Sequence, residues 1–210
     1  MPAKLEELKQ TFLVEATKNN VLPIGGGLWT VALHPELRVV PPYKEWMFAG
    51  NMTRMPEVTA PALGNRNNLV SIDAEIPPNA NGVLYVLGAF SGGLATYIKD
   101  GKLCYEYNLF EIQRTRACSP ENIATGKVKV EVETVYAEAK PAGPLSVTLK
   151  VNGSVVVRTR VPVSAPLLFT ANDCLDIGTD LGSPVALDYF DKAPFAFNGK
   201  IAEVKVKYLK

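Results

Sequence analysis

Apolar and polar residues alternate with a period of two along most of the chain from Trp46 onward. In the runs LVSIDAEI and GKVKVEVETVY the apolar residues occupy every second position, so each run presents one apolar and one polar face. Such runs are typical of antiparallel sheets that are solvated on one side. Because the apolar faces must be buried, we expect an all-β fold, a two-sheet antiparallel jelly-roll sandwich.

Two short sequences indicate where strands reverse. Asp100-Gly101 separates LATYIK from KLCYEYNLF, and Asn152-Gly153 separates LSVTLKV from SVVVRTRV. Asp-Gly and Asn-Gly favour two-residue hairpin turns, because both positions of the turn need positive φ. Each pair therefore predicts a β-hairpin. The run GVLYVLGAF is apolar without alternation, which predicts a central strand that is buried on both faces.

The N-terminal part has a different pattern. Residues 3–19 carry apolar side chains at three- and four-residue spacing, which predicts a short helix with one apolar stripe, formed by Leu5, Leu8, Phe12 and Ala16. Prolines and Gly25–Gly27 follow and favour an extended linker. The glycine run lacks the Lys-Ser or Lys-Thr of a phosphate-binding loop. We therefore expect a helix and linker segment over 1–45 and the sandwich domain over 46–210.

Composition and charge exclude several function classes. The chain has 210 residues and a formal net charge of +1, so it has no overall field that attracts nucleic acid or an anionic membrane. No run approaches the roughly 18 apolar residues of a membrane span, and MPAKLEELKQ lacks the apolar core of a signal peptide. We expect a soluble chain, cytoplasmic as given. Cys104, Cys118 and Cys174 are widely spaced, and we expect free thiols that are buried or partly buried rather than a disulfide framework.

The residue inventory is poor for catalysis. His34 is the only histidine, which argues against a Ser-His-Asp triad and against a histidine-based zinc site. A two-carboxylate glycosidase stays open, because its requirement is a separation in space; the carboxylates on strand-like runs are Glu106, Glu111, Glu131 and Glu133. The last two share a face with Lys127 and Lys129, which favours a solvated charged surface. We assign no catalytic residue.

Two sets of residues are candidates for binding. Tyr97, Tyr105 and Tyr107 lie on the Asp100-Gly101 hairpin and predict either a glycan-binding surface or core packing. In LDIGTDLGSPV the alternate spacing of Asp176 and Asp180 is compatible with a structural calcium site. The alternative is that Asp173, Asp176 and Asp180 cap turns while Gly178 and Gly182 supply unusual dihedral angles. We expect no cofactor beyond this calcium ion.

Several segments, taken in order, resemble the C-terminal part of large bacterial arylsulfatases. They are AKLEELKQTFLVEATKNNVLPI, RMPEVTAPALGNRNNLVSIDAEI, GVLYVLGAFSGGLATYIKDGKLCYEYNLF, and LDIGTDLGSPV followed by PFAFNGKIAEVKV. The resemblance implies a concanavalin A-like, laminin G-like jelly roll. The sulfatase catalytic core is not in this sequence. CSPEN at 118–122 has the Pro of a formylglycine motif but lacks its Ser and Arg.

The resemblance implies a non-catalytic accessory or interaction domain. The helix stripe and the linker would then pack on a sulfatase catalytic domain, or on a second copy of the chain. The alternative is a carbohydrate-binding module of the concanavalin A-like class.

Overall fold

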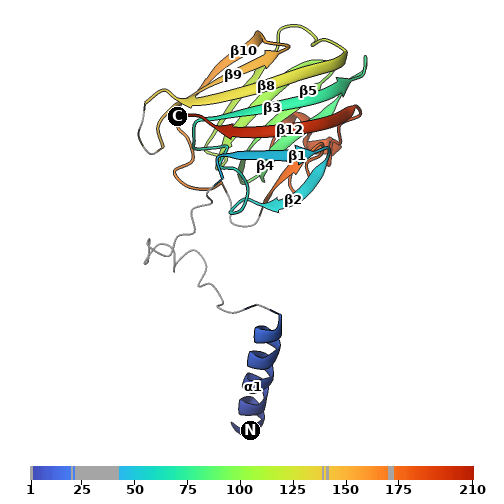
Figure 1. Ribbon diagram of the computed structural model, residues 1–210. Coiled ribbons are helices and arrows are strands. Elements are labelled where there is room, and N and C mark those ends of the chain that lie inside the picture. The colour runs from blue at the N-terminus through green and yellow to red at the C-terminus, as the bar shows by residue number, and fades with distance from the viewer. Residues whose placement is uncertain (1, 20, 22–42, 139, 141, 170–172) are drawn as a thin grey trace. The chain divides into compact units, whose positions relative to one another are not determined.

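The chain forms two units that are described separately (Figure 1). The computed structural model describes residues 2–19, 21, 43–138, 140, 142–169 and 173–210. The first unit comprises residues 1–42 and the second residues 43–210. Gly25–Gly27 and His34 lie outside the described residues, so the interpretations attached to them are not addressed by the structure.

Helix α1 spans Pro2–Lys18, as the apolar spacing predicts. Its polar face carries ion pairs at three-residue spacing, such as Lys4 with Glu7. Leu5, Leu8 and Phe12 of the apolar stripe are 57%, 54% and 49% exposed, whereas Ala16 is buried. Within the described residues, no helix is long and apolar enough to cross a membrane.

The second unit is a sandwich of two six-stranded sheets, counted over the described residues. We call the first sheet A; it faces the viewer in Figure 1. Its strands, in spatial order, are β1 (Glu45–Ala49), β12 (Lys200–Tyr208), β3 (Asn68–Ile76), β8 (Gly126–Tyr136), β9 (Leu145–Val151) and β10 (Ser154–Val161). Sheet B contains β2 (Met52–Pro56), β11 (Cys174–Ile177), β4 (Gly82–Ala89), β5 (Gly92–Lys99), β6 (Lys102–Leu109) and β7 (Gln113–Cys118). Neighbouring strands pair antiparallel, which confirms the predicted fold class.

Both predicted hairpins are present. Asp100 and Gly101 join β5 to β6 with φ values of 50° and 80°. Asn152 and Gly153 join β9 to β10 with φ values of 50° and 81°. Positive φ at both positions is the condition that the Asp-Gly and Asn-Gly pairs meet most easily. The two turns therefore fix the register of the strands that they connect.

Sheet B is buried on both faces along β4, β5 and most of β6. Its inner face contributes to the core between the sheets, together with the alternating valines and isoleucines of sheet A. Its outer face is covered by the segment 178–198, which includes the short 3₁₀ helix η2 (Leu187–Lys192). Val185, Tyr189 and Phe195 of this cover segment pack on outward-facing side chains of sheet B. The cover segment explains why GVLYVLGAF does not alternate.

The expectation for the cysteines was wrong in one respect. Cys104 and Cys118 form a disulfide, whereas Cys174 is a free thiol. Cys104 on β6 is the register partner of Cys118 on β7, and their Cα atoms are 4.0 Å apart. Directly opposed residues on paired strands lie close enough for this bond. Spacing in the sequence does not reveal the pairing, because the β6–β7 turn carries no signal that fixes its register.

Candidate functional site

The three tyrosines that were candidates for glycan binding are all buried. Tyr97, Tyr105 and Tyr107 are each at most 1% exposed, so their rings offer no surface on which a sugar could stack. Tyr105 and Tyr107 point into the core between the sheets, whereas Tyr97 points to the outer face beneath the cover segment. The opposite orientation follows from register, because Tyr97 pairs with Cys104 and side chains alternate along β6. The prediction of a surface formed by these three rings is therefore corrected.

The two aspartates of the predicted calcium site accept hydrogen bonds from the protein. The carboxylate of Asp176 accepts from the backbone N–H of Arg54 and of Leu181. The Asp180 Oδ2 atom accepts from the backbone N–H of Val185 at 3.0 Å and from the hydroxyl of Tyr189 at 2.7 Å. Gly178 and Gly182 have φ values of 82° and 110°. These contacts match the turn-capping alternative.

Asp180 is nevertheless an unusual residue. It is 1% exposed, and its Oδ1 atom has no hydrogen-bond partner within the described residues. Burial raises the pKa of Asp180 to about 6, against the lowering effect of the hydrogen bonds from Tyr189 and Val185. Calcium binding at Asp176 and Asp180 stays a prediction. A cation would find Asp180 Oδ1 without a partner among the described residues, whereas it would compete with N–H and O–H donors at the other three carboxylate oxygens.

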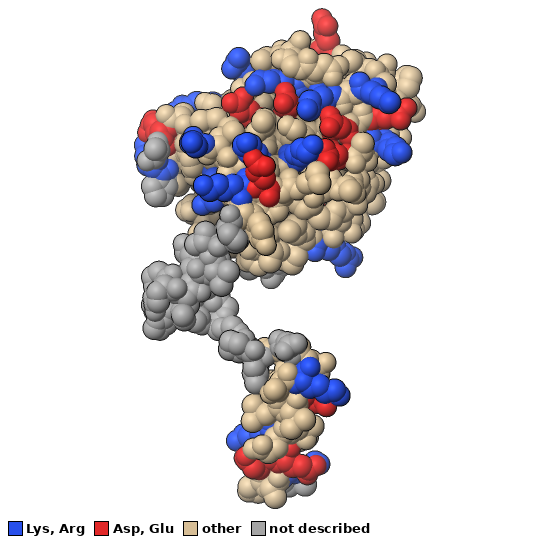
Figure 2. Space-filling view, in the orientation of Figure 1, with Lys and Arg blue, Asp and Glu red and all other residues tan. Residues whose placement is uncertain are grey.

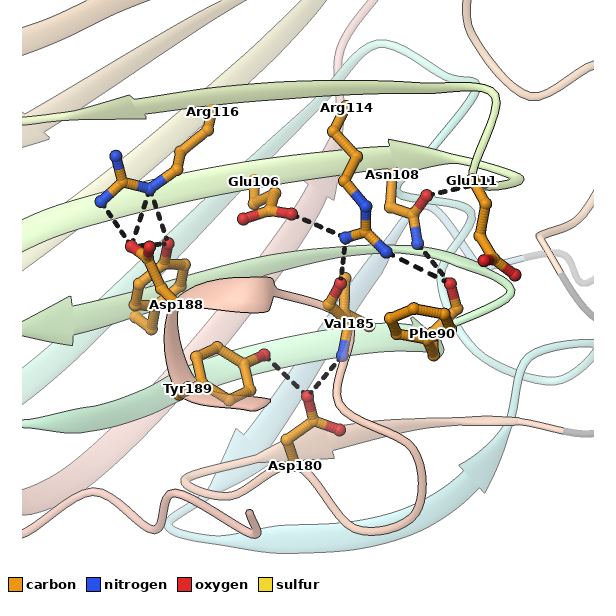
Figure 3. A network of polar contacts seen from close by, with 11 residues as sticks. Phe90, Glu106, Asn108, Glu111, Arg114, Arg116, Asp180, Val185, Asp188 and Tyr189 are labelled. Atoms are coloured by element: carbon orange, nitrogen blue, oxygen red, sulfur yellow. Dashed lines mark hydrogen bonds and ion pairs between the residues drawn. The ribbon is translucent and has the colours of Figure 1, made fainter. Parts of the chain in front are cut away.

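A network of charged side chains ties the cover segment to sheet B (Figure 3). Arg114 on β7 donates from one nitrogen to Glu106 Oε1 at 2.7 Å and to the carbonyl of Val185 at 2.7 Å. Its guanidinium also lies over the ring of Phe90, 5.1 Å from the centroid. One arginine thus links a buried carboxylate of β6, the cover segment and the β4–β5 turn. Glu106 is 2% exposed, so Arg114 is its charge partner in a place where water hardly reaches.

Asp188 of η2 is held in a second part of the same network. It accepts hydrogen bonds from the hydroxyl of Tyr97 at 2.8 Å and from Arg116 Nε at 2.7 Å, and it lies 3.6 Å from Lys99 Nζ. Hydrogen bonds from Tyr97 and Arg116 lower the pKa of Asp188 although burial opposes them. Burial raises the pKa of Glu106 although Arg114 opposes it. Each carboxylate is thus occupied by an internal partner.

Two carboxyls whose pKa values are driven apart are a pattern that glycosidases use. Here the acid with the raised pKa is buried and bound by Arg114, so a glycosidic oxygen has no access to it. Asp188 also lies within 4.8 Å of the sulfurs of Cys104 and Cys118, the one group of metal-ligating atoms found among the described residues. Those sulfurs are joined in the disulfide. The network therefore holds the cover segment in place, and within it Arg114 engages Glu106 while Tyr97 and Arg116 engage Asp188.

Among the described residues, a group of unpaired charged side chains lies on the outer face of sheet A, on the opposite side of the sandwich from this network. Cross-strand register arranges them in rows that run across β12, β3 and β8. One row is Lys200, Glu75 and Lys127, and in the next row Asp73 lies beside Lys129. Figure 2 shows charged side chains of both signs spread over this face. The prediction that Lys127 and Lys129 line a solvated face with Glu131 and Glu133 is confirmed, since all four lie on the outward side of β8.

A groove of about 560 Å³ opens between these rows. Its lining includes the charged residues Asp73, Glu75, Lys127, Lys129 and Lys200, together with Asn152 and Ala202. The hollow has a local cause. A β-bulge between Ile201 and Glu203 adds Ala202 to the outer face of β12, and its methyl group leaves space that a longer side chain would fill.

The charged side chains of the groove are not paired with one another. Within the described residues, Asp73, Glu75, Lys127, Lys129 and Lys200 make no side-chain hydrogen bond or ion pair. Their neighbours on the same face differ, since Lys150 pairs with Glu133 at 2.8 Å and Lys205 pairs with Glu203 at 2.7 Å. The groove therefore concentrates unused donors and acceptors. Compared with the internal network, the groove presents polar groups that remain available to a ligand.

The sequence reasoning found part of this site. It placed Lys127 and Lys129 on an exposed face, but it did not identify the groove. Glu75 and Asp73 appear in LVSIDAEI as ordinary polar positions of an alternating strand. The bulge at Ala202 shifts the alternation in KIAEVKVKY by one residue, and no glycine or proline marks its position in the sequence. The groove depends on how three strands that are distant in sequence are aligned.

Comparison with known proteins identifies the fold. No protein-family model matches the chain, and no curated protein sequence matches it. Among solved structures, the CBM40 domain of the Ruminococcus gnavus IT-sialidase, bound to α2,3-sialyllactose, has a TM-score of 0.51 at 15% identity. The match covers 79% of this chain and 93% of that domain. Domains LG4-5 of the mouse laminin α1 chain have a TM-score of 0.55 at 13% identity, covering 83% of this chain and 45% of that one.

These likenesses confirm a concanavalin A-like, laminin G-like fold. Both similar structures come from proteins other than sulfatases, so the expected relation to arylsulfatases receives no support from them.

Proposed function

We propose that the protein is a non-catalytic carbohydrate-binding module and that the groove on the outer face of sheet A is its binding site. The observation that carries this proposal is the set of unpaired donors and acceptors around one groove of about 560 Å³. That volume lies within the roughly 300–1,000 Å³ of small-molecule sites. A saccharide presents hydroxyl groups that both donate and accept, so it can pair with ammonium donors and with carboxylate acceptors.

The arrangement of the groove suits such a ligand in two further respects. Its side chains stand on strands inside a sheet, so the backbone positions are fixed before binding and only the side chains have to be ordered. In the row formed by Lys200, Glu75 and Lys127, an acceptor lies between two donors. The CBM40 domain with a similar fold is described as bound to α2,3-sialyllactose, which supports carbohydrate as the ligand class.

A filled-groove variant tests the proposal. In Ala202→Gln the longer side chain occupies the hollow without changing charge, and residue 202 is exposed, so the core is unaffected. Ala49→Gln is the matched control, because Ala49 is also exposed on sheet A but lies on the edge strand β1 outside the groove. Binding is screened on a glycan array and quantified by isothermal titration calorimetry. We expect Ala202→Gln to lose binding and Ala49→Gln to retain it. Failure of the unmodified protein to bind any glycan would overturn the proposal.

A second candidate function is that of an accessory domain that packs on a sulfatase catalytic domain. The open apolar stripe of α1 favours it, since Leu5, Leu8 and Phe12 are about half exposed. A reading frame for a sulfatase catalytic domain directly upstream of this gene, and co-purification of the two products, would support it. Turnover of nitrophenyl sulfate by the pure protein would contradict a non-catalytic role.

A further inference from the structure

The charges of the groove point to the class of carbohydrate. We propose that the groove binds an anionic oligosaccharide, one whose sugar carries a carboxylate or a sulfate group, and this rests on the carbohydrate-binding function proposed above. Three ammonium groups and two carboxylates line the groove, so the set carries an excess of one positive charge. The paired residues nearby, such as Lys205 with Glu203, contribute no net charge.

The position of the excess positive charge indicates where the anionic group of the ligand would bind. Lys200 and Lys127 stand on either side of Glu75 in one row. Their strands are two positions apart in the sheet, so the two Cα atoms lie roughly 10 Å apart. Long, flexible side chains can converge from that separation on one anionic group above Glu75. The remaining groups, Asp73 and Lys129, lie one row further along the strands and are placed for the hydroxyl groups of the same ligand.

Lysine suits this role because an ammonium group offers three donors and little geometric restriction. The absence of an ion pair between Glu75 and either lysine means that an incoming anion breaks no existing salt bridge within the described residues. Because these charges are exposed, their attraction must weaken strongly as salt is added. This dependence separates charge recognition from hydrogen bonding to hydroxyl groups.

The experiment compares ligands that share one neutral core. Lactose, 3′-sialyllactose and 3′-sulfolactose are titrated calorimetrically into the full chain. We expect both anionic ligands to bind roughly 2- to 30-fold more tightly than lactose, which corresponds to about 0.2–1 kcal/mol for each of two exposed charge pairs. The gap should close when NaCl rises from about 20 mM to about 500 mM.

A matched pair of double variants assigns the effect to the groove. Lys127→Gln with Lys200→Gln removes the two lysines that flank Glu75, and we expect the preference for anionic ligands to disappear. Lys150→Gln with Lys205→Gln removes the same charge from the same face at lysines that are already paired, and we expect the preference to persist. Circular dichroism confirms that each variant is folded.

The outcomes separate the two proposals. Equal affinity for lactose and both anionic ligands, abolished by Ala202→Gln, overturns the anionic preference and leaves the glycan site. Equal loss of preference in both double variants also overturns it, since the effect would then be a general one of surface charge. Absence of binding to these ligands and to every glycan on the array overturns both proposals.

Discussion

Removal of Arg114 is the sharpest test of the network that holds the cover segment. Arg114 is the charge partner of Glu106, whose side chain is only 3% exposed, at 2.7 Å. Arg114→Met leaves a buried carboxylate without its partner, and such a loss costs about 3–5 kcal/mol. Because the Arg114 side chain is itself 19% exposed, we expect the lower end of this range, about 3 kcal/mol. Glu106→Gln keeps a hydrogen-bond acceptor for Arg114 and should cost only about 1 kcal/mol.

The double variant separates the ion pair from the other contacts of Arg114. Arg114 also donates to the carbonyl of Val185 and stacks on Phe90, and these losses appear in Arg114→Met whether or not residue 106 is charged. In Glu106→Met with Arg114→Met no charge is left buried, so we expect a coupling energy of about 2 kcal/mol between the two sites. Arg158→Met, at an exposed arginine of β10, is the control and should change stability by less than about 0.5 kcal/mol.

The pH dependence provides an independent check. Burial already raises the pKa of Glu106, and Arg114 lowers it. Without Arg114 the pKa rises further, so the protonated carboxyl is favoured in the folded state. A carboxyl whose folded pKa is raised contributes most to stability at low pH and loses that contribution as pH rises. The deficit of Arg114→Met should therefore shrink by at least about 1 kcal/mol between about pH 7 and about pH 5.

Urea denaturation at both pH values, followed by far-ultraviolet circular dichroism, measures these quantities. If Arg114→Met and Glu106→Gln cost the same small amount, with no coupling and no pH dependence, then Glu106 is solvated and the reasoning fails.

Three further predictions follow from the same structure. Thiol titration of the unfolded, unreduced protein should find one free thiol, because Cys104 and Cys118 are bonded, and it should find three thiols after reduction. Three thiols without reduction would contradict the disulfide. Replacing Cys104 and Cys118 with alanine should lower the free energy of unfolding by about 3 kcal/mol, since the bond closes a loop of 14 residues. Burial raises the pKa of Asp180 from 3.8 to about 6, so the stability from this group is full below about pH 4 and is lost as pH rises through about 6. With EDTA present to remove metal ions, Asp180→Asn should remove up to about 3 kcal/mol of this pH dependence of the unfolding free energy. Identical stability–pH profiles for the two proteins would refute this prediction. Deletion of residues 1–20 should convert a dimer to a monomer in light scattering if α1 pairs with a second copy, and an unchanged mass for both proteins excludes that pairing.

Local sequence patterns specify the geometry of the individual strands, turns and helix. Period-two alternation specifies which face of a strand is buried, because successive side chains point to opposite sides of a sheet. Asp100-Gly101 and Asn152-Gly153 specify two hairpins, because few other residues accept positive φ at both positions. The three- and four-residue spacing of leucine and phenylalanine specifies α1. These signals are local, so no knowledge of distant contacts was needed to interpret them.

The contacts between residues that are distant in the sequence follow from the tertiary structure. The Cys104–Cys118 bond depends on the pairing register of β6 and β7, which no residue of the connecting turn indicates. The sequence left open whether the three tyrosines are exposed or packed in the core; a segment some 80 residues later along the chain covers the outer face of their hairpin and buries Tyr97. The groove likewise combines β12, β3 and β8, together with a bulge at Ala202. Long-range alignment is set by the packing of the whole sandwich, and a local pattern does not contain it.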